Sequence, residues 1–247
     1  MALTDVLITG CGGLLSYLVG SVPFGYLAGR LLAGVDIRIF GSGNIGATNV
    51  ARVFGGFRGV LVFLGVFFLD VGKGVAAAGG LAAAARAVTG TADPAGAIGI
   101  VYGLMAIAGH VFPVWLGFRG GKAVATSCGV MFALAPVETA GAVAVWVVVL
   151  AAARIVSLAS VLAALGLVAA RFAVRAGPWR GSDLPLTLMM LVVAALVVVR
   201  HHANIRRLIA GTEPRIGRRR HHGGSEDKAK RPKNNPPEIR QEKSGLV

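Results

Sequence analysis

The sequence predicts an all-α protein, a bundle of helices that crosses a membrane several times. Hydrophobic residues make up 55% of the 247 residues and charged residues only 15%, whereas about a quarter of the residues in a soluble globular protein are charged. The mean hydropathy is +0.72, and several apolar stretches reach the ~20 residues that a helix needs to cross the hydrocarbon core. Glycine-rich polar segments separate these stretches.

Seven apolar stretches are expected to form transmembrane helices. The first follows no basic segment, so we expect it to be retained and not cleaved as a signal peptide. The fourth is short, ~20 Å as a helix, and is expected to be tilted or re-entrant. Five crossings are the alternative, because the apolar block after Lys122 divides in more than one way. The seven stretches are residues 6–32, 59–85, 94–116, 123–135, 137–153, 155–172 and 184–199.

The distribution of basic residues predicts the orientation. Positive charge gathers in the first loop, around residues 117–122, at Arg154 and after Arg200. The positive-inside rule places these four regions in the cytoplasm. The N-terminus then lies outside, the C-terminus is cytoplasmic, and these four basic regions face the cytoplasm. Three arginines on the outer side break the rule: Arg171, Arg175 and Arg180.

Two regions differ in composition. Residues 1–213 are expected to form one transmembrane domain, and residues 214–247 a basic, disordered tail, because this tail is rich in charge and proline. From residue 215 onward the chain has ten Lys or Arg and four Asp or Glu, within a total net charge of +14. Beside a membrane, such a tail favours anionic lipid headgroups over nucleic acid. Cys11 and Cys128 lie in apolar segments and are interpreted as small buried hydrophobic residues.

The first polar segment, residues 41–52 (motif 1), reads GSGNIGATNVAR. Its small residues let the backbone approach a ligand, and its short polar side chains and terminal arginine match the donors that phosphate prefers. The alternative is a flexible interfacial loop. The expected phosphate-binding side chains are Ser42, Asn44, Thr48, Asn49 and Arg52.

Motif 2, residues 117–122, reads GFRGGK. We expect Gly120 and Gly121 to open directly into a helix, whose free N–H groups and partial positive charge favour a phosphate. Lys122 adds a full charge at the same point. The spacing is not that of a Walker A loop.

Motif 3, residues 200–213, reads RHHANIRRLIAGTE. His201 and Asn204 are three residues apart and are expected on one helical face. His201 or its neighbour His202 can donate to a phosphate or accept a proton. Glu213 is expected to anchor the end of this segment by pairing with an arginine from another loop.

Each basic motif alone is explained by the positive-inside rule or by interfacial snorkelling. The hypothesis of an anion site rests on the three motifs sharing one face. Asp70 and Lys73, three residues apart in an apolar stretch, are expected to form a buried structural pair, and His110 to bond a neighbouring helix. The sequence shows no metal-ligand cluster and no nucleotide-binding motif, so no metal or cofactor is expected.

The motifs carry a family resemblance. GSGNIGATNVAR, GHVFPVWLGFRGGKAVAT and RHHANIRRLIAGTE resemble, in order, the three motifs of the bacterial acyl-phosphate:glycerol-3-phosphate acyltransferases, which are small integral membrane enzymes of phospholipid biosynthesis. The pieces GSVPFGYLAGR, FLDVGKG and VSLAS match as well. The resemblance covers residues 20–213, and the tail lies outside it.

The resemblance implies transfer of a fatty acyl group from acyl phosphate to the 1-hydroxyl of sn-glycerol 3-phosphate, giving 1-acyl-glycerol 3-phosphate (lysophosphatidic acid) and inorganic phosphate. It implies a soluble acyl-phosphate synthase as a metabolic partner. Ser42, Arg52, Lys122 and the backbone of Gly120 and Gly121 would hold phosphate. His201 and Asn204 would position the glycerol moiety or a phosphate, and Glu213 would support the local structure.

The chemistry of the substrates constrains the mechanism. Acyl phosphate is already activated, so we expect direct attack by the substrate hydroxyl without a covalent enzyme intermediate. The proton acceptor is a substrate phosphate or His201. A His-x4-Asp match at residues 222–227 lies in the tail and is interpreted as chance. The main rival function is a transporter of phosphorylated metabolites, and a scaffold that uses its basic tail is a third.

Overall fold

The computed structural model describes residues 3–93 and 96–217, and every regular element within them is helical. The all-α prediction is therefore confirmed. In chain order the α-helices are α1 (Leu3–Ser21), α2 (Phe24–Ala33), α3 (Ala47–Phe54), α4 (Gly56–Val75), α5 (Ala82–Thr89), α6 (Ala97–Val111), α7 (Val124–Leu134), α8 (Pro136–Ala153), α9 (Val156–Val174), α10 (Asp183–Arg200) and α11 (His202–Ile209). Two short 3₁₀ segments, η1 (Ile37–Ile39) and η3 (Val114–Leu116), and one π-helical segment, η2 (Ala76–Leu81), complete the list.

Each of the seven expected apolar stretches contains a helix. Six helical spans in the described residues are long and apolar enough to cross a membrane: Leu3–Ala33, Gly56–Thr89, Ala97–Leu116, Pro136–Ala153, Val156–Val174 and Asp183–Arg200. The remaining helix, α7, has 11 residues and is the stretch that the sequence analysis expected to be tilted or re-entrant. The number of crossings and the orientation stay predictions. Residues 218–247, with the His-x4-Asp match, lie outside the described residues.

The first span bends at Pro23. Proline has no N–H group for the helical ladder, so α1 ends at Ser21 and α2 starts at Phe24. Two glycines of this span lie in close contact with two different partners. A Cβ at Gly20 would overlap the carbonyl of Ala106 in α6, whereas one at Gly25 would overlap the loop before α3.

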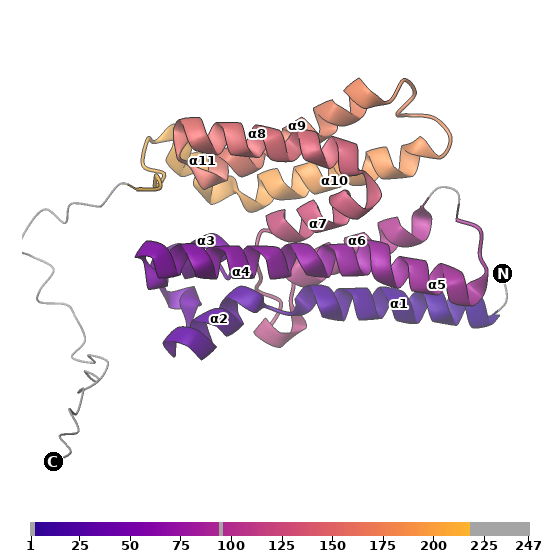
Figure 1. Ribbon diagram of the computed structural model, residues 1–247, viewed down its shortest axis with the longest axis horizontal. Coiled ribbons are helices and arrows are strands. Elements are labelled where there is room, and N and C mark those ends of the chain that lie inside the picture. Colours follow the sequence, from indigo (N-terminus) through magenta and orange to yellow (C-terminus); the bar gives the residue numbers. More distant parts are fainter. Residues whose placement is uncertain (1–2, 94–95, 218–247) are drawn as a thin grey trace, which may run out of the picture. The chain divides into compact units, whose positions relative to one another are not determined.

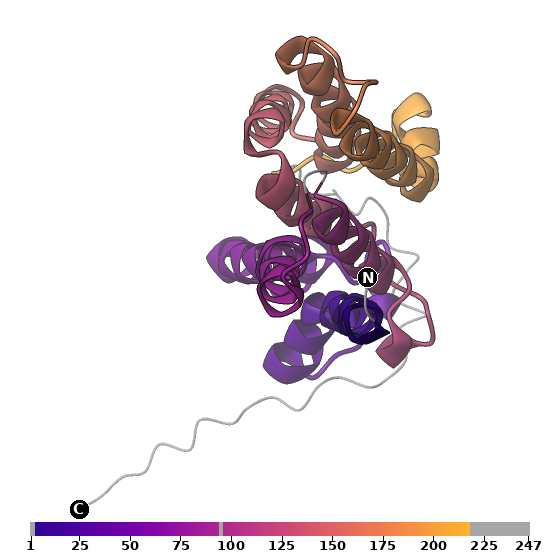
Figure 2. The same ribbon diagram turned by 90° about the vertical axis from the view of Figure 1, so that its right-hand side faces the viewer.

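Helix α7 joins two groups of helices. One group contains α1, α4 and α6, and the other contains α8, α9 and α10; α7 contacts α4 and α6 on one side and α8 and α10 on the other. Figures 1 and 2 show the two groups on either side of α7. The largest cluster of buried apolar side chains lies at this junction and includes Ile107, Val130, Met131, Leu167 and Met189. The core therefore fixes the position of α7, which begins next to motif 2.

Apolar side chains also cover the outside of the helices. Phe68 is 63% exposed and Val148 is 66% exposed, which is costly for a soluble surface but suits contact with lipid. Figure 1 shows α3 and α11 at the same end of the bundle. Motif 1 leads into α3, and motif 3 contains α11.

A buried ion network ties α8, α9 and α10 together. Arg171 of α9 is 1% exposed, and its guanidinium pairs with Glu138 of α8 at 3.0 Å and with Asp183 of α10. Its Nε also donates to the hydroxyl of Thr187 at 3.2 Å. Two carboxylates thus neutralise one of the three arginines that break the positive-inside rule.

We predict that Arg171→Leu destabilises the protein by about 3–5 kcal/mol, because it leaves the buried Glu138 carboxylate with only the more distant, half-exposed Arg175 as a partner. Arg180→Leu is the matched control, since Arg180 is exposed, and it should change stability little. The measurement is thermal unfolding of both variants in the same detergent. Equal unfolding temperatures for the two variants would contradict the structural role of the network.

Candidate active site

Motif 1 forms a loop that leads into α3, and Asn49 holds this loop together. Asn49 is 2% exposed. Its Oδ1 accepts a hydrogen bond from the N–H of Ser42 at 2.9 Å, and its Nδ2 donates to the carbonyls of Ile37 and Phe40 at 2.9 and 3.0 Å. The expectation that its side chain binds phosphate is therefore wrong for this structure, because all of these bonds are internal.

The other polar residues of motif 1 are more accessible. Ser42 and Arg52 are exposed, and Thr48 in the first turn of α3 is half-buried. Asn44 is also half-buried, and its Oδ1 accepts the N–H of Gly46 at 2.8 Å. This bond forms an Asx turn that shapes the entry to α3. Of the five expected side chains, Ser42 and Arg52 are the exposed ones, and ligand binding by Ser42, Thr48 and Arg52 stays a prediction.

The two glycines of motif 2 have a different role from the expected one. The N–H of Gly120 donates to the carbonyl of Val111, and the N–H of Gly121 to that of His110, both at 3.1 Å. These N–H groups already have partners, and α7 begins only at Val124. The predicted anion cradle at a helix N-terminus is thus wrong. Glycine is needed here because a Cβ at either position would overlap His110 or its carbonyl.

Arg200 fixes the same loop from the opposite side. Its guanidinium donates to the carbonyl of Gly120 at 3.1 Å and to that of Gly121 at 2.9 and 3.1 Å. The loop is therefore bonded to the end of α6 through its N–H groups and to the end of α10 through its carbonyls. This arrangement sets the position of Lys122. The sequence analysis did not single out Arg200, because an arginine at the end of an apolar helix is already explained by the positive-inside rule.

A chain of hydrogen bonds joins motif 2 to motif 3. The ammonium of Lys122 donates to Oδ1 of Asn204, and Nδ2 of Asn204 donates to Glu213 at 2.6 Å. The carboxylate of Glu213 also accepts from Arg207 at 2.7 Å and from the hydroxyl of Ser157 at 2.6 Å. The arginine that pairs with Glu213 thus belongs to motif 3 itself, and not to another loop as expected.

Ser157, in the first turn of α9, is a residue that the sequence analysis did not assign to the site. The sequence feature that could have indicated it is the short segment VSLAS, which matches the family pattern. Burial alone would raise the pKa of Glu213, but the hydrogen bonds from Ser157, Asn204 and Arg207 outweigh it and lower the pKa. Glu213 is therefore a carboxylate at neutral pH, able to orient the amide of Asn204.

Charges from all three motifs act on Lys122. Burial lowers the pKa of Lys122 to about 8; the nearby Glu213 carboxylate opposes this shift, and the positive charges of Arg207, Arg52 and Arg200 add to it. Arg52 comes from motif 1 and Arg207 from motif 3, so the three motifs converge around one ammonium group. One carboxylate against several cations leaves an excess of positive charge, which favours a phosphate dianion.

His201 lies beside this centre and is 3% exposed. Burial and the charge of Lys122 lower the pKa of His201 to about 4, so the ring is neutral at pH 7. Its Nδ1 lies 2.7 Å from the carbonyl of Val197, which makes Nδ1 the protonated nitrogen and leaves a lone pair on Nε2. His202 is exposed, with its Nδ1 3.0 Å from the carbonyl of Val199.

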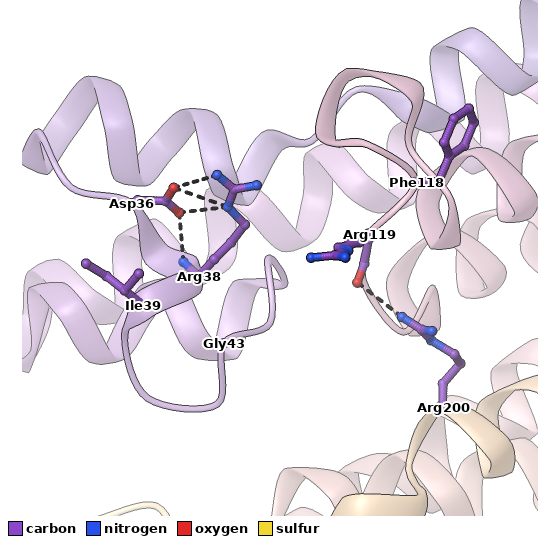
Figure 3. A pocket seen from close by; sticks show the side chains of 8 residues that line it. Asp36, Arg38, Ile39, Gly43, Phe118, Arg119 and Arg200 are labelled. Atoms are coloured by element: carbon purple, nitrogen blue, oxygen red, sulfur yellow. Dashed lines mark hydrogen bonds and ion pairs between the residues drawn. The ribbon is translucent and has the colours of Figure 1, made fainter.

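A basic cavity adjoins the motif 2 loop. It has a volume of about 500 Å³ and is lined by Asp36, Arg38, Ile39, Gly43, Phe118, Arg119, Gly120 and Arg200. Asp36 and Arg38 form an ion pair at 2.6 Å, and this hydrogen-bonded pairing lowers the pKa of Asp36 to about 2. Figure 3 shows Arg38, Arg119 and Arg200 around the opening. The approach to the loop that carries Lys122 is therefore positively charged.

Asp70 and Lys73 lie within α4, away from these exposed groups. Lys73 Nζ is 2.8 Å from Asp70 Oδ1, and both side chains are buried. Lys73 also donates to the carbonyl of Val22 at 3.0 Å, at the bend between α1 and α2. His110 of α6 reaches Thr126 of α7, so it does contact a neighbouring helix.

Known proteins match the chain over most of its length. The family model described as glycerol-3-phosphate acyltransferase matches residues 11–211. The chain belongs to the glycerol-3-phosphate acyltransferase family. A relative of that name from Gloeobacter violaceus is 46% identical over 202 residues, covering 82% of this chain and 92% of the relative. Another, from Thermosynechococcus vestitus, is 44% identical and covers 87% of this chain and 98% of the relative.

Solved structures of this family also match. The crystal structure of PlsY (YgiH), an integral membrane glycerol 3-phosphate acyltransferase in its glycerol 3-phosphate form, is 37% identical to this chain with a TM-score of 0.70. The match covers 87% of this chain and 96% of PlsY. The lysophosphatidic acid form of PlsY is 36% identical with a TM-score of 0.68. The family match includes Arg52, Lys122 and Asn204, whereas Glu213 lies just beyond it.

We predict that Gly121→Ala lowers activity more than tenfold, because the added methyl would overlap the His110 ring and displace the loop that carries Lys122. Gly72→Ala in α4 is the matched control, since a Cβ there meets no atom within 4 Å. Acyl transfer by the two purified variants is the measurement. Full activity of Gly121→Ala would show that the loop tolerates this displacement.

Proposed function

We propose that this chain transfers a fatty acyl group from acyl phosphate to the 1-hydroxyl of sn-glycerol 3-phosphate at the cytoplasmic face of the bacterial plasma membrane. The observation that carries the proposal is the convergence of Lys122, Arg52 and Arg207 at the polar end of an apolar bundle. Both substrates carry phosphates, and the acyl chain needs an apolar environment. The described part of the chain supplies both a cluster of positive charges and apolar helix surfaces.

The reaction is a direct displacement. The 1-hydroxyl oxygen of glycerol 3-phosphate attacks the carbonyl carbon of acyl phosphate, and the ester C–O bond forms. The C–O bond to phosphate breaks, and phosphate leaves with the electron pair. Lys122 and Arg52 hold the phosphates and stabilise the negative charge that develops, Ser42 adds a hydroxyl donor, and Asn204 and His201 orient the glycerol moiety.

The departing phosphate accepts the hydroxyl proton in this proposal. A phosphate monoester has a second pKa of about 6, whereas the pKa of His201 is lowered to about 4. The phosphate is therefore the stronger base at neutral pH. It also lies next to the reacting hydroxyl, because it leaves from the carbon under attack. His201 is left as a positioning group.

The proposed partners follow from the substrates. Acyl phosphate is delivered by a soluble acyl-phosphate synthase, and the lysophosphatidic acid product enters the membrane. The basic tail has no part in the reaction. The remaining rival, a transporter of phosphorylated metabolites, would place its substrate near the membrane midplane, whereas α3 of motif 1 and α11 of motif 3 lie at one end of the helices (Figure 1).

The test is product formation by the purified protein with glycerol 3-phosphate and one donor at a time. We expect lysophosphatidic acid and inorganic phosphate in a one-to-one ratio with acyl phosphate, and no product with acyl-CoA or acyl carrier protein. Product with acyl-CoA alone would overturn the proposed donor. Binding of glycerol 3-phosphate without turnover on any donor would favour the transporter.

The pKa of Lys122 predicts how substrate binding depends on pH. A lysine with a pKa of about 8 is charged below that pH and loses its charge as the pH rises through it. The phosphate is already a dianion there, so KM for glycerol 3-phosphate should rise above pH 8. Lys122→Arg keeps the charge at every pH of the assay and should flatten this rise. An unchanged rise in Lys122→Arg would show that another group titrates.

A further inference from the structure

A buried polar cluster lies directly beneath the motif 2 loop. It is formed by side chains of three helices: Asp70 and Lys73 of α4, His110 of α6 and Thr126 of α7. All four residues are at most 5% exposed. Charged groups inside an apolar bundle are costly, and these four are not among the groups that meet the substrate in the proposed reaction. Helix packing alone would be served by apolar residues of the same size.

His110 holds the chain on both sides of Lys122. Its carbonyl accepts the N–H of Gly121 at 3.1 Å, one residue before Lys122. Its ring Nδ1 lies 3.2 Å from the hydroxyl of Thr126, four residues after Lys122. The ring also packs so closely against Gly121 that no Cβ would fit between them. The short segment that carries Lys122 is therefore held by one histidine.

Asp70 and Lys73 lie beside that histidine. Oδ1 of Asp70 lies 3.6 Å from Nδ1 of His110 and 2.8 Å from Nζ of Lys73. Lys73 is in turn bonded to the carbonyl of Val22, which lies beside the bend at Pro23. The cluster thus links the bend between α1 and α2 to the loop between α6 and α7.

We propose that Asp70, Lys73, His110 and Thr126 form a positioning unit that sets where Lys122 meets the phosphate of the substrate. The inference rests on the proposed function for the identity of that substrate. A shift of the loop by about 1 Å lowers the rate of an aligned reaction by up to a hundredfold. The unit acts through the loop and makes no contact of its own with the phosphate.

The test is a pair of substitutions at Thr126. Thr126→Val removes the hydroxyl and keeps the shape, whereas Thr126→Ser keeps the hydroxyl. Thr139→Val is the matched control, because Thr139 is also buried and its hydroxyl bonds only the Ala135 carbonyl one turn earlier, beyond the far end of α7. The measurements are kcat and KM for glycerol 3-phosphate, its dissociation constant by calorimetry, and the unfolding temperature, all on the full chain in detergent.

We expect Thr126→Val to raise KM and the dissociation constant about tenfold, with Thr126→Ser within about threefold of the wild type and Thr139→Val unchanged. A purely structural role would lower the unfolding temperature and the amount of active protein but leave both constants unchanged, and that result would overturn the proposal. Calorimetry measures binding without turnover. A failure of the proposed chemistry would therefore be distinguishable, because the wild type would bind glycerol 3-phosphate but form no product.

Discussion

The hydrogen bond between Lys122 and Asn204 joins two parts of the candidate active site that are 82 residues apart in the chain. Separate hydrogen bonds hold each of the two residues in place. The loop before Lys122 is bonded to α6 through its N–H groups and to Arg200 through its carbonyls. Asn204 is held by the Glu213 carboxylate. A lysine side chain is flexible when free, so these contacts give Lys122 a defined position in the proposed phosphate site.

Glycine serves a packing role in motif 2 that differs from its expected one. The sequence favoured a cradle of free N–H groups, as glycine-rich loops form around phosphates in other proteins. In this fold the N–H groups bind carbonyls of α6, and the lack of a Cβ lets the loop lie flat against His110. In the proposed site, the phosphate is therefore bound by charged side chains and not by these N–H groups. Such a site keeps its geometry only while the loop stays closely packed.

The sequence predicted the helical bundle, because apolar stretches of this length have few other folds in a membrane. It also singled out the three motifs and most of the charged residues of the candidate site, whose types match phosphate. It missed Ser157 and Arg200, since a serine at a helix start and an arginine at a helix end have ordinary explanations. It misassigned Asn49, because side chains that bond their own loop have the same composition as side chains that bond a ligand. The partner of Glu213 depends on how the chain turns back after α11, where the N–H of Thr212 bonds the carbonyl of Arg207, and no local pattern encodes this.

The central claim is that phosphate binds where the three motifs converge. The most direct measurement is a structure of this chain with glycerol 3-phosphate bound. The account predicts phosphate oxygens within hydrogen-bond distance of Lys122 Nζ and the Arg52 guanidinium, with Glu213 still bonded to Asn204. A phosphate held instead by Arg38 and Arg119 in the adjoining cavity, with Lys122 still directed only at Asn204, would contradict it.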